Sequence, residues 1–437
     1  MSAAAACMVG AAADGGLAGR RLLVVGGGAE AVPGLERLRA LGARLVVSDR
    51  DPHAPGFALA EERLLASTYD VDATVLAARA LHARTPIDGV MCIAADVPVT
   101  VAAVADALGL PGLPVAAAAR TADKLVMKQA LRAAGVPVPD FAAVDTPAEL
   151  RREVRRMGGL AICKPVDSRG ARGVQRLAPG ADFERAFARA RAASPTGRVM
   201  VERFVEGPQL SSESFLAPDG AIATPGLADR NYEWLDACAP WVIENGGELP
   251  ARDAARLAGP VDALMRAAAE ALGIPSGVVK GDLVVDPARG PLVIELAARL
   301  SGGSFCTLTI PLSTGVDLVE AVARHAVGLP VDLEALRPRH ARPVANRYFR
   351  PPPGRLRALE GVEAARRLPG VVRLDLAVAP GDRIRPLVDH TCRVGSVIAV
   401  GDTREQAVAR ARAAVDAVRF HVDPEPAAAA PCTEALA

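Results

Sequence analysis

The chain has 437 residues, a formal net charge of +1 and 51% hydrophobic residues. This length exceeds what one hydrophobic core usually organises, so two or three domains are expected. Aromatic residues make up only 3% of the chain, and its many Arg residues are spread among Glu and Asp, which argues against a nucleic-acid-binding surface.

The two ends of the chain and its cysteines carry no targeting or metal-binding signal. Residues 1–19 are rich in Ala and Gly and are predicted to be a disordered leader; the Ala- and Pro-rich residues 424–437 are predicted to be a disordered tail. No apolar span of 18 residues is found, so no membrane association is expected. The seven cysteines lack CxxC or Cys/His spacing, which favours free thiols and a cytoplasmic protein.

The N-terminal part alternates strands and helices. RRLLVVGGGAE (20–30) predicts a buried strand and a glycine turn, followed by a helix through Leu41 and a second strand over 44–49. Further elements are predicted at 88–93 (strand), 97–108 (helix) and 112–115 (strand-like). This order favours a parallel, doubly wound, Rossmann-like domain.

The glycines of that first turn allow two interpretations. Gly26, Gly27 and Gly28, with Asp49 some way on, invite a dinucleotide-binding interpretation and hence a nicotinamide oxidoreductase. The spacing departs from GxGxxG, however, because Glu30 follows and Gly34 arrives one position late. A tight turn in a Rossmann-like lobe is the favoured interpretation.

The rest of the chain mixes strands and helices irregularly. A helix over 121–134 is predicted to end at Gly135, because Gly followed by Pro is typical of a helix C-terminus. The later predicted helices cover 182–193, 252–272, 316–327 and 403–418, and the predicted strands include 161–166, 199–205, 211–217 and the two halves of 280–298. The fold class is therefore a combination of α/β and α+β.

A strand that ends in a glycine-bearing loop is a candidate phosphate site. In AICKPVDSRGARGV (161–174) Lys164 precedes Ser168, Gly170 and Gly173, and glycines let backbone N–H groups close on a phosphate. The Lys lies before the loop, so this is not a Walker P-loop, and an ordinary hairpin is the alternative. Lys124 in TADK (121–124) is a second candidate, or else a solvated helix lysine.

The segment VMVERFVEGPQ (199–209) is a candidate adenine site. The end of a strand can present backbone donors and acceptors to a planar base, and Glu202, Glu206 and Gln209 supply polar side chains for the exocyclic amine and the ribose. The alternative is a capped strand end with exposed acids.

Two acids are expected to meet on one face of a hairpin in KGDLVVDPARGPLVIELAARLSGG (280–303). Pairing its halves sets Asp282 nearly opposite Glu295, and strand periodicity points Glu295, Ala297 and Arg299 the same way. Adjacent acids on an apolar sheet need compensating cations. Oxygen ligands without His or Cys favour Mg²⁺ or Mn²⁺, whereas the alternative is a surface hairpin with solvated acids.

In this order these elements resemble the ATP-grasp superfamily over residues 20–420. Within it the chain is most similar to carboxylate-amine ligases related to L-amino-acid ligases and biotin carboxylase; TADKLVMKQALRAAGVPVP (121–139) and VSDRDPHAPG (47–56) add to the likeness. The resemblance implies a three-domain ATP-grasp architecture. Its expected parts are a Rossmann-like domain (20–118), an ATP-grasp domain (119–335) with a lid subdomain near 140–206, and a C-terminal α+β domain (336–423).

The resemblance also implies a role for each candidate residue. Lys124 and Lys164 would contact the ATP phosphates, and loop 167–173, with Ser168, Gly170 and Gly173, would form a lid. Glu202 with Val205 would form the adenine hinge. Asp282 with Glu295 would bind Mg²⁺. Arg299 and the backbone N–H groups of Ser301–Ser304 would hold the developing oxyanion. Arg230 with Asn231, and Arg347, would close on substrate. Two departures are Ala297, where the family has Asn, and Gln209, where many members have Glu.

The implied reaction is ATP-dependent activation of a carboxylate as an acyl phosphate, with release of ADP and transfer to an amine, such as an amino acid. The partners would be small molecules, and a homodimer is one assembly that the resemblance allows. A bicarbonate-activating enzyme similar to biotin carboxylase or to carbamoyl-phosphate-forming enzymes is one alternative. A non-catalytic ATP-binding regulator, suggested by Ala297, is another.

Overall fold

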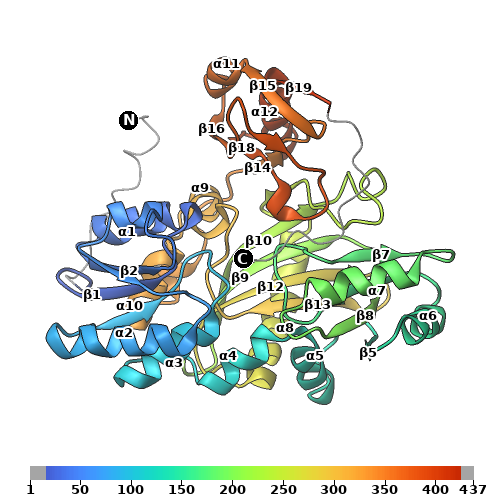
Figure 1. Cartoon of the computed structure of the whole chain (residues 1–437). Helices are drawn as coiled ribbons and strands as arrows, with labels where there is room; N and C mark the ends of the chain where they lie inside the picture. The colour runs from blue at the N-terminus through green and yellow to red at the C-terminus, as the bar shows by residue number, and fades with distance from the viewer. Residues whose placement is uncertain (1–15, 425–437) are drawn as a thin grey trace.

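The computed structural model describes residues 16–424, which form an N-terminal, a central and a C-terminal part (Figure 1). Most of the predicted leader and tail, residues 1–15 and 425–437, lies outside the described residues. Within residues 16–19, Leu17 is buried in a hydrophobic core, whereas Ala18 and Gly19 are exposed. No helix within residues 16–424 is long and apolar enough to cross a membrane.

The N-terminal part is a parallel sheet of four strands in the order β3-β2-β1-β4. Its elements are β1 (Arg21–Val25), α1 (Val32–Ala40), β2 (Arg44–Asp49), β3 (Glu62–Leu65), α2 (Val71–Arg84), β4 (Gly89–Met91) and α3 (Pro98–Leu108). The Rossmann-like prediction is confirmed, although β3 was not predicted. The strand-like interpretation of 112–115 is wrong: α4 (Val115–Ala122) begins there, because Pro114 lacks a donor for a sheet and precedes an Ala-rich helical run.

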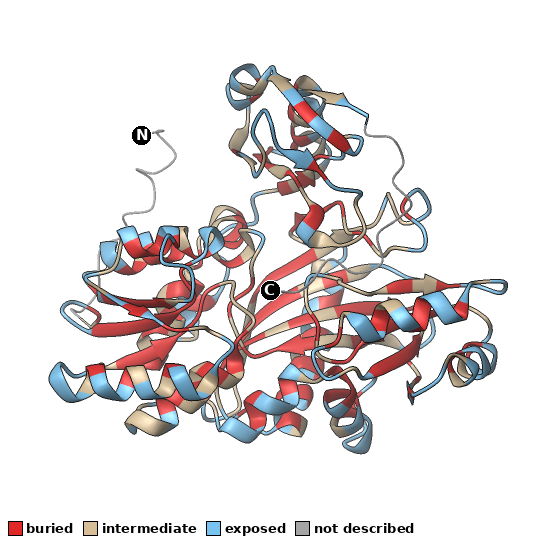
Figure 2. Ribbon diagram, in the orientation of Figure 1, coloured by how far each residue is buried: buried red, intermediate tan, exposed pale blue. Residues whose placement is uncertain are grey.

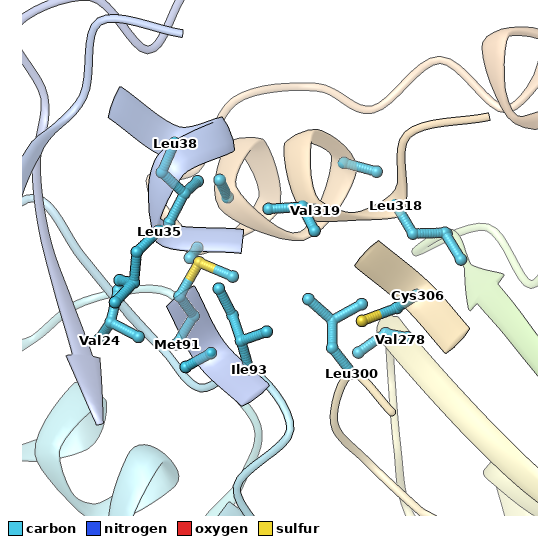
Figure 3. Close-up of a cluster of buried hydrophobic side chains, with 14 of the residues drawn as sticks. Val24, Leu35, Leu38, Met91, Ile93, Val278, Leu300, Cys306, Leu318 and Val319 are labelled. Carbon is cyan, nitrogen blue, oxygen red and sulfur yellow. The ribbon is translucent and has the colours of Figure 1, made fainter. Parts of the chain in front are cut away.

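Both faces of this sheet are covered. Successive side chains of β1 point to opposite faces, and all five residues of β1 are buried. Leu22 and Val24 pack on the same side as α1, whereas Leu23 and Val25 pack on the side of α2 and α3. The first side is completed by α10 (Leu318–Ala326), which comes from much later in the chain. Figure 3 shows this shared core, which joins Val24, Leu35, Met91 and Ile93 to Val278, Leu300, Cys306, Leu318 and Val319. The N-terminal and central parts are therefore joined by one continuous core.

The glycine turn after β1 is a packing device. Gly27 donates its N–H to Oδ2 of Asp49 at 2.9 Å, and Oδ1 of Asp49 accepts from the N–H of Asp51. A Cβ on Gly27 would lie 2.9 Å from Val47, and one on Gly56 would lie 2.8 Å from Gly27. Because Asp49 is already engaged, the structure favours the tight-turn interpretation over a dinucleotide site.

The helix predicted over 121–134 is divided at Asp123. Helix α5 (Lys124–Ala133) follows α4, and the Asp123 carboxylate caps it by accepting from the N–H groups of Leu125 and Val126. This break places Lys124 at the first helical position, directed toward the central part of the protein rather than along the surface of one long helix.

Residues 141–203 form a small antiparallel sheet of order β5-β8-β6-β7 that carries two helices. The elements are β5 (Phe141–Val144), α6 (Pro147–Arg156), β6 (Ala161–Pro165), β7 (Gln175–Leu177), α7 (Phe183–Ala192) and β8 (Val199–Arg203). The predicted strands at 161 and 199 and the helix at 182 are confirmed. Figure 2 shows the helices of this unit exposed on one side and buried on the side that packs on the sheet.

The largest sheet has eight strands in the order β13-β12-β9-β10-β11-β14-β18-β16. Its central members and their helices are β9 (Gln209–Leu216), β10 (Ile222–Asn231), β11 (Gly246–Leu249), α8 (Ala254–Leu272), β12 (Gly277–Asp286), β13 (Gly290–Ala297) and α9 (Ile310–Thr314). The C-terminal part contributes β14 (Val344–Tyr348), β16 (Val371–Leu376) and β18 (Gly395–Val400) to it, so the central and C-terminal parts share one sheet.

The remaining C-terminal elements form a second layer above that sheet. Strands β15 (Gly354–Glu360), β17 (Arg383–Ile384) and β19 (Arg419–Asp423) make a sheet of three, with helices α11 (Val362–Arg366) and α12 (Arg404–Ala417). The predicted last helix is confirmed. The limits of the predicted domains stay predictions.

Truncating Leu35 should loosen the shared core. Leu35 is 0% exposed, so Leu35→Ala is expected to lower the free energy of unfolding by about 2–5 kcal/mol, measured by urea denaturation. The control Leu76→Ala, on α2 and 72% exposed, should change it by less than about 0.5 kcal/mol. Equal losses in the two variants would contradict this view of the core.

Candidate active site

A cavity of about 990 Å³ opens where the three parts of the protein meet, and it gathers most of the predicted site residues. Those that line it are Lys124, Lys164, Ser168, Gly170, Glu202, Val205, Gln209, Arg230, Asp282, Glu295, Ala297 and Arg299. Gly173, Asn231 and Arg347 are not among the lining residues. The acids and the lysines predicted from separate segments therefore face one space.

A buried cluster of two lysines and one glutamate forms one wall. Lys164 of β6 contacts Oε1 of Glu202 on the neighbouring strand β8, and Nζ of Lys128 lies 2.8 Å from Oε2. Burial alone would raise the pKa of Glu202, but the two ammonium groups hold it below its usual value. Lys128 is fully buried, and burial lowers its pKa to about 8. One carboxylate thus compensates two cations in the interior.

This cluster changes the role expected of Glu202. Its carboxylate is taken by Lys128 and Lys164, so it is not available to an adenine amine. Strand β8 ends at Arg203, and the following residues Val205 and Gln209 line the cavity. A base could therefore be met there by backbone groups and by Gln209, rather than by the Glu202 side chain.

Lys124 connects the glycine-bearing loop to the acid pair. Its Nζ lies 2.9 Å from Oε1 of Glu295 and donates to the carbonyl oxygen of Ser168 at 2.6 Å. Burial alone would lower the pKa of Lys124, but the nearby Glu295 carboxylate raises it above its usual value. The solvated-lysine alternative is wrong, because Lys124 is buried and engaged on both sides.

The glycine-bearing loop is divided between the cavity and a packing contact. Ser168 Oγ is buried and has no hydrogen-bond partner within residues 16–424. The carbonyl oxygen of Gly170 accepts a hydrogen bond from the N–H of His390 at 2.9 Å. Gly173 has φ +73°, and a Cβ there would meet Ala193 at 2.8 Å. Gly173 therefore allows the loop to pack near the end of α7 and does not face the cavity.

The hairpin pairs the two acids as expected. Asp282 on β12 is directly opposite Glu295 on β13, and both line the cavity, so the surface-hairpin alternative is wrong. Asp282 accepts from Ser211 at 3.2 Å, from Lys280, and from Nη1 of Arg230 at 2.8 Å, in each case through Oδ1. Burial alone would raise its pKa, but Arg230 and Lys280 hold it well below its usual value.

Each acid keeps one oxygen without such a contact. Lys124 uses Oε1 of Glu295, and the cations around Asp282 use Oδ1, which leaves Oε2 and Oδ2 as ligand atoms. Residues 16–424 contain no group of three or more His, Cys, Asp or Glu side chains that could hold a metal. Two carboxylates nevertheless fit Mg²⁺, which usually takes one or two protein carboxylates together with substrate phosphates.

The arginines predicted for catalysis and substrate binding differ in their surroundings. Arg299 lines the cavity with its Nε 3.5 Å from Oδ1 of Asp96, which lies in the loop after β4. Arg230 is fixed on both sides, by Oε2 of Glu244 at 2.6 Å and by Asp282. Arg347 is buried against the cavity-lining Glu248 but does not itself line the cavity, because β14 turns its side chain into the interior.

The loop after Arg299 is held by two carboxylates. Glu213 is fully buried and accepts the Ser301 N–H at 2.8 Å and the Ser301 hydroxyl; burial raises its pKa. Glu30, from the glycine turn of the N-terminal part, accepts the N–H of Gly303 at 2.9 Å. Two of the N–H groups expected to hold an oxyanion are therefore engaged within the protein, which corrects that part of the prediction.

Several site residues were missed, and for some of them the sequence held a signal. Lys128 lies four positions after Lys124 on one helix face, and Lys280 lies two positions before Asp282 on one strand face. No local pattern identifies Asp96, Glu213 or Glu244, because distant segments of the chain bring Asp96 and Glu244 to the cavity and Glu213 to the loop after Arg299.

Replacing Glu202 should be costly because it leaves two buried cations with less compensation. Glu202→Gln is expected to lower the free energy of unfolding by about 3–5 kcal/mol at pH 7, measured by urea denaturation. A carboxyl whose folded pKa is depressed stabilises the fold above its unfolded pKa, about 4.3, so the difference from the parent should shrink as the pH falls below that value.

The double variant Lys128→Met with Glu202→Gln is the matched control. It removes one of the two cations and should recover part of the loss. A difference that stays constant between pH 7 and pH 3.5, or no recovery in the double variant, would contradict the charge compensation.

Comparisons with known proteins agree with the three-part fold. A model of the ATP-grasp N-terminal domain matches residues 35–112, a model of the ATP-grasp domain matches 121–303, and a model of the L-amino acid ligase C-terminal domain 2 matches 347–423. The order of the three matches follows the three parts of the structure.

Individual proteins are similar over long stretches. The uncharacterized protein y4rH of Sinorhizobium fredii is 28% identical over 89% of this chain and 80% of its own length. A D-alanine--D-alanine ligase of Bordetella avium is 29% identical over 57% of this chain and 72% of its own length.

One solved structure shows the shared fold. The crystal structure of L-amino acid ligase from Bacillus licheniformis has a TM-score of 0.78 with 22% identity, and the match covers 93% of this chain and 100% of that chain. On the matched domain models, and in accord with the fold, the chain belongs to the ATP-grasp superfamily and, within it, to the carboxylate-amine ligases.

Proposed function

We propose that this ATP-grasp ligase phosphorylates a small carboxylic acid with ATP and joins the resulting acyl phosphate to an amine, with amino acids and similar small molecules as substrates. The observation that carries the proposal is the gathering of Lys124, Lys164, Asp282, Glu295 and Arg299 around one cavity. These residues supply cations, metal-ligand oxygens and an anion contact in the same space.

The chemistry explains why these groups are needed together. A carboxylate resists attack because it is an anion and because oxide is a poor leaving group. Transfer of the γ-phosphoryl group of ATP to the carboxylate oxygen breaks the bond to ADP and creates a good leaving group, phosphate. An amine then attacks the acyl carbon, loses a proton and expels phosphate. Charge accumulates on oxygen at each step, so fixed cations lower both barriers.

The residues of this chain would divide that work. Lys164 and Lys124, held by Glu202 and Glu295, would meet the phosphate oxygens, and the Ser168 hydroxyl, which has no partner within the described residues, would donate to one of them. Arg299 would meet the oxyanion. A Mg²⁺ ion held by Asp282 and Glu295 would neutralise charge on the transferring phosphoryl group.

A bicarbonate-activating reaction is the alternative, since it would use the same nucleotide site. A screen of ADP release with Mg²⁺-ATP and amino acids or small acids, singly and in pairs, separates the two. Activity that needs two organic partners supports ligation, whereas activity that needs bicarbonate supports the alternative. The absence of substrate-dependent ADP release would favour the non-catalytic regulator.

Glu295→Gln should remove most of the activity without removing the fold. Glu295 is partly exposed and Gln has nearly the same size, so the fold should be kept. The amide of Gln is, however, a weaker metal ligand and a weaker partner for Lys124 than the carboxylate. Losing one such electrostatic contact costs about 3 kcal/mol, so ADP release should fall roughly a hundredfold or more.

The control for this prediction is Glu36→Gln, an exposed acid on α1 outside the cavity lining, which should keep parental activity. Circular dichroism and the unfolding midpoint check the fold of both variants. Near-parental ADP release from Glu295→Gln would contradict its assignment as a metal ligand.

One divalent cation per chain is expected in the presence of ADP. Ala297 lies opposite Lys280, both face the cavity, and the Lys280 ammonium contacts Asp282, so a cationic side chain lies where the hairpin has no amide ligand. Titration of Mn²⁺ by electron paramagnetic resonance with ADP should give one site in the parent. The double variant Lys280→Met with Ala297→Asn should gain a second, weaker site.

Two Mn²⁺ sites in the parent, or no additional binding by the double variant, would contradict this expectation. Ala297→Asn alone is the matched control, because it adds the amide while the Lys280 charge remains.

A further inference from the structure

The C-terminal part brings a turn into the cavity that the proposed mechanism does not use. The turn covers His390–Cys392 and is followed by Arg393, and both His390 and Arg393 line the cavity. The N–H of His390 donates to Gly170 of the glycine-bearing loop at 2.9 Å. The turn therefore lies beside the glycine-bearing loop that lines one side of the cavity, and it belongs to the part of the chain that supplies none of the proposed phosphate or metal contacts.

Arg393 is held rigidly but lacks a counter-ion. Its guanidinium carbon stacks 3.7 Å from the ring centre of Tyr348, and Nη2 donates to the backbone carbonyl of Glu244 at 2.6 Å. Nε is buried and has no hydrogen-bond partner within residues 16–424. Stacking and one carbonyl fix the plane of the guanidinium and leave a donor edge unused.

Two other arginines of the cavity are different, whereas Arg169 and Arg172 of the glycine-bearing loop also form no ion pair with a carboxylate of the described residues. Arg230 is paired with Glu244 and Asp282, and Arg299 is paired with Asp96. Arg393 forms no ion pair with a carboxylate of the described residues, since the nearby Glu244 carboxylate is used by Arg230. Arg393 is half-buried, and a partly buried guanidinium without a carboxylate partner is stabilised by a ligand that supplies the opposite charge.

His390 adds a second unused polar atom on the same turn. Its Nε2 is buried and has no partner among the residues that the structure describes. His390 and Arg393 are adjacent, since the N–H of Arg393 donates to the carbonyl of His390. Two unsatisfied polar atoms beside one cavity wall match a ligand that offers more than one acceptor oxygen.

We propose that Arg393, with His390 beside it, binds a carboxylate of the substrate that is not the one activated by ATP, so that the amine substrate is an amino acid or another amine that carries its own carboxylate. This inference rests on the proposed ligase function and adds to it the residues that would recognise the carboxylate of the amine substrate. The planar guanidinium edge fits a carboxylate through paired N–H donors. Lys164, Asp282 and Arg299 are already assigned to the γ-phosphate and the activated carboxylate, which leaves the Arg393 edge for a second carboxylate.

A phosphate of ATP is the other oxyanion that could reach this turn, because the turn touches the glycine-bearing loop. The phosphates already have Lys124, Lys164 and the Ser168 hydroxyl. Arg393 instead donates to the carbonyl oxygen of Glu244, whose carboxylate pairs with Arg230. The carboxylate assignment is therefore favoured, and the experiment has a separate arm for ATP.

The test compares each amino acid with its carboxamide in the full-length chain. The pair of amino acids that gives the fastest ADP release is identified, and the amine substrate is replaced by its amide. The parent should show a KM at least tenfold higher for the amide. Arg393→Met should raise the KM for the acid at least tenfold, leave the KM for the amide within about twofold, and leave the KM for ATP unchanged. Arg393→Lys should recover part of the affinity for the acid.

The matched control is Arg373→Met, a cavity-lining arginine paired with Asp375, which should keep the preference for the acid. Equal use of acid and amide by the parent would overturn the proposal. An increase in the KM for ATP in Arg393→Met, with the preference for the acid retained, would instead assign Arg393 to the phosphates and overturn it as well.

A binding measurement separates this inference from the proposed function. Thermal shifts of the Mg²⁺-ADP-bound chain are recorded with each L-amino acid and its amide. If no pair releases ADP, the ligase function fails, but an amino acid that stabilises the parent more than its amide does, with the difference lost in Arg393→Met, would still support the carboxylate subsite. No difference for any amino acid would overturn it.

Discussion

The buried Glu202 carboxylate, shared by Lys128 and Lys164, is the interaction on which the site depends. The lysines come from α5 and β6 and the acid comes from β8, so the cluster fixes the small antiparallel sheet against the helix that also carries Lys124. Two ammonium groups with a single carboxylate leave a local excess of positive charge in the interior. That excess is costly in the free protein and becomes favourable when an anionic ligand such as a triphosphate arrives.

The acid pair of the hairpin shows the complementary arrangement. Asp282 and Glu295 would repel each other, but Arg230, Lys280 and Lys124 each contact one oxygen of the pair. These side-chain cations supply the compensation that the sequence alone attributed to a metal. A metal is still accommodated because the contacts fall on one oxygen of each carboxylate, and the charge arrangement is prepared before the nucleotide binds.

Much of the fold and part of the site could be predicted from the sequence. The run RLLVV, the glycine-ended helix before VPVP and the alternation in the hairpin specify local geometry, and the hairpin prediction gave the observed pairing of Asp282 with Glu295. Strand β10, IATPGLADRN, was missed because Pro225 and Gly226 disguise it and a bulge interrupts its pairing. Helix α6 was missed although Thr146 caps it and Pro147 begins it, a signal that the chain does carry.

The sequence by itself determined which residues alternate on a strand, where helices end and hence that two acids and two lysines were available in a particular order along the chain. Only the tertiary structure decided which of them share a carboxylate, that Arg347 pairs with Glu248, that Gly173 serves packing, and that Arg393 reaches the cavity with an unused donor. The physical reason is the separation along the chain over which each interaction acts. Backbone periodicity is set by neighbouring residues, whereas desolvation and ion pairing depend on segments that lie more than a hundred positions apart, as Glu295 and Lys124 do.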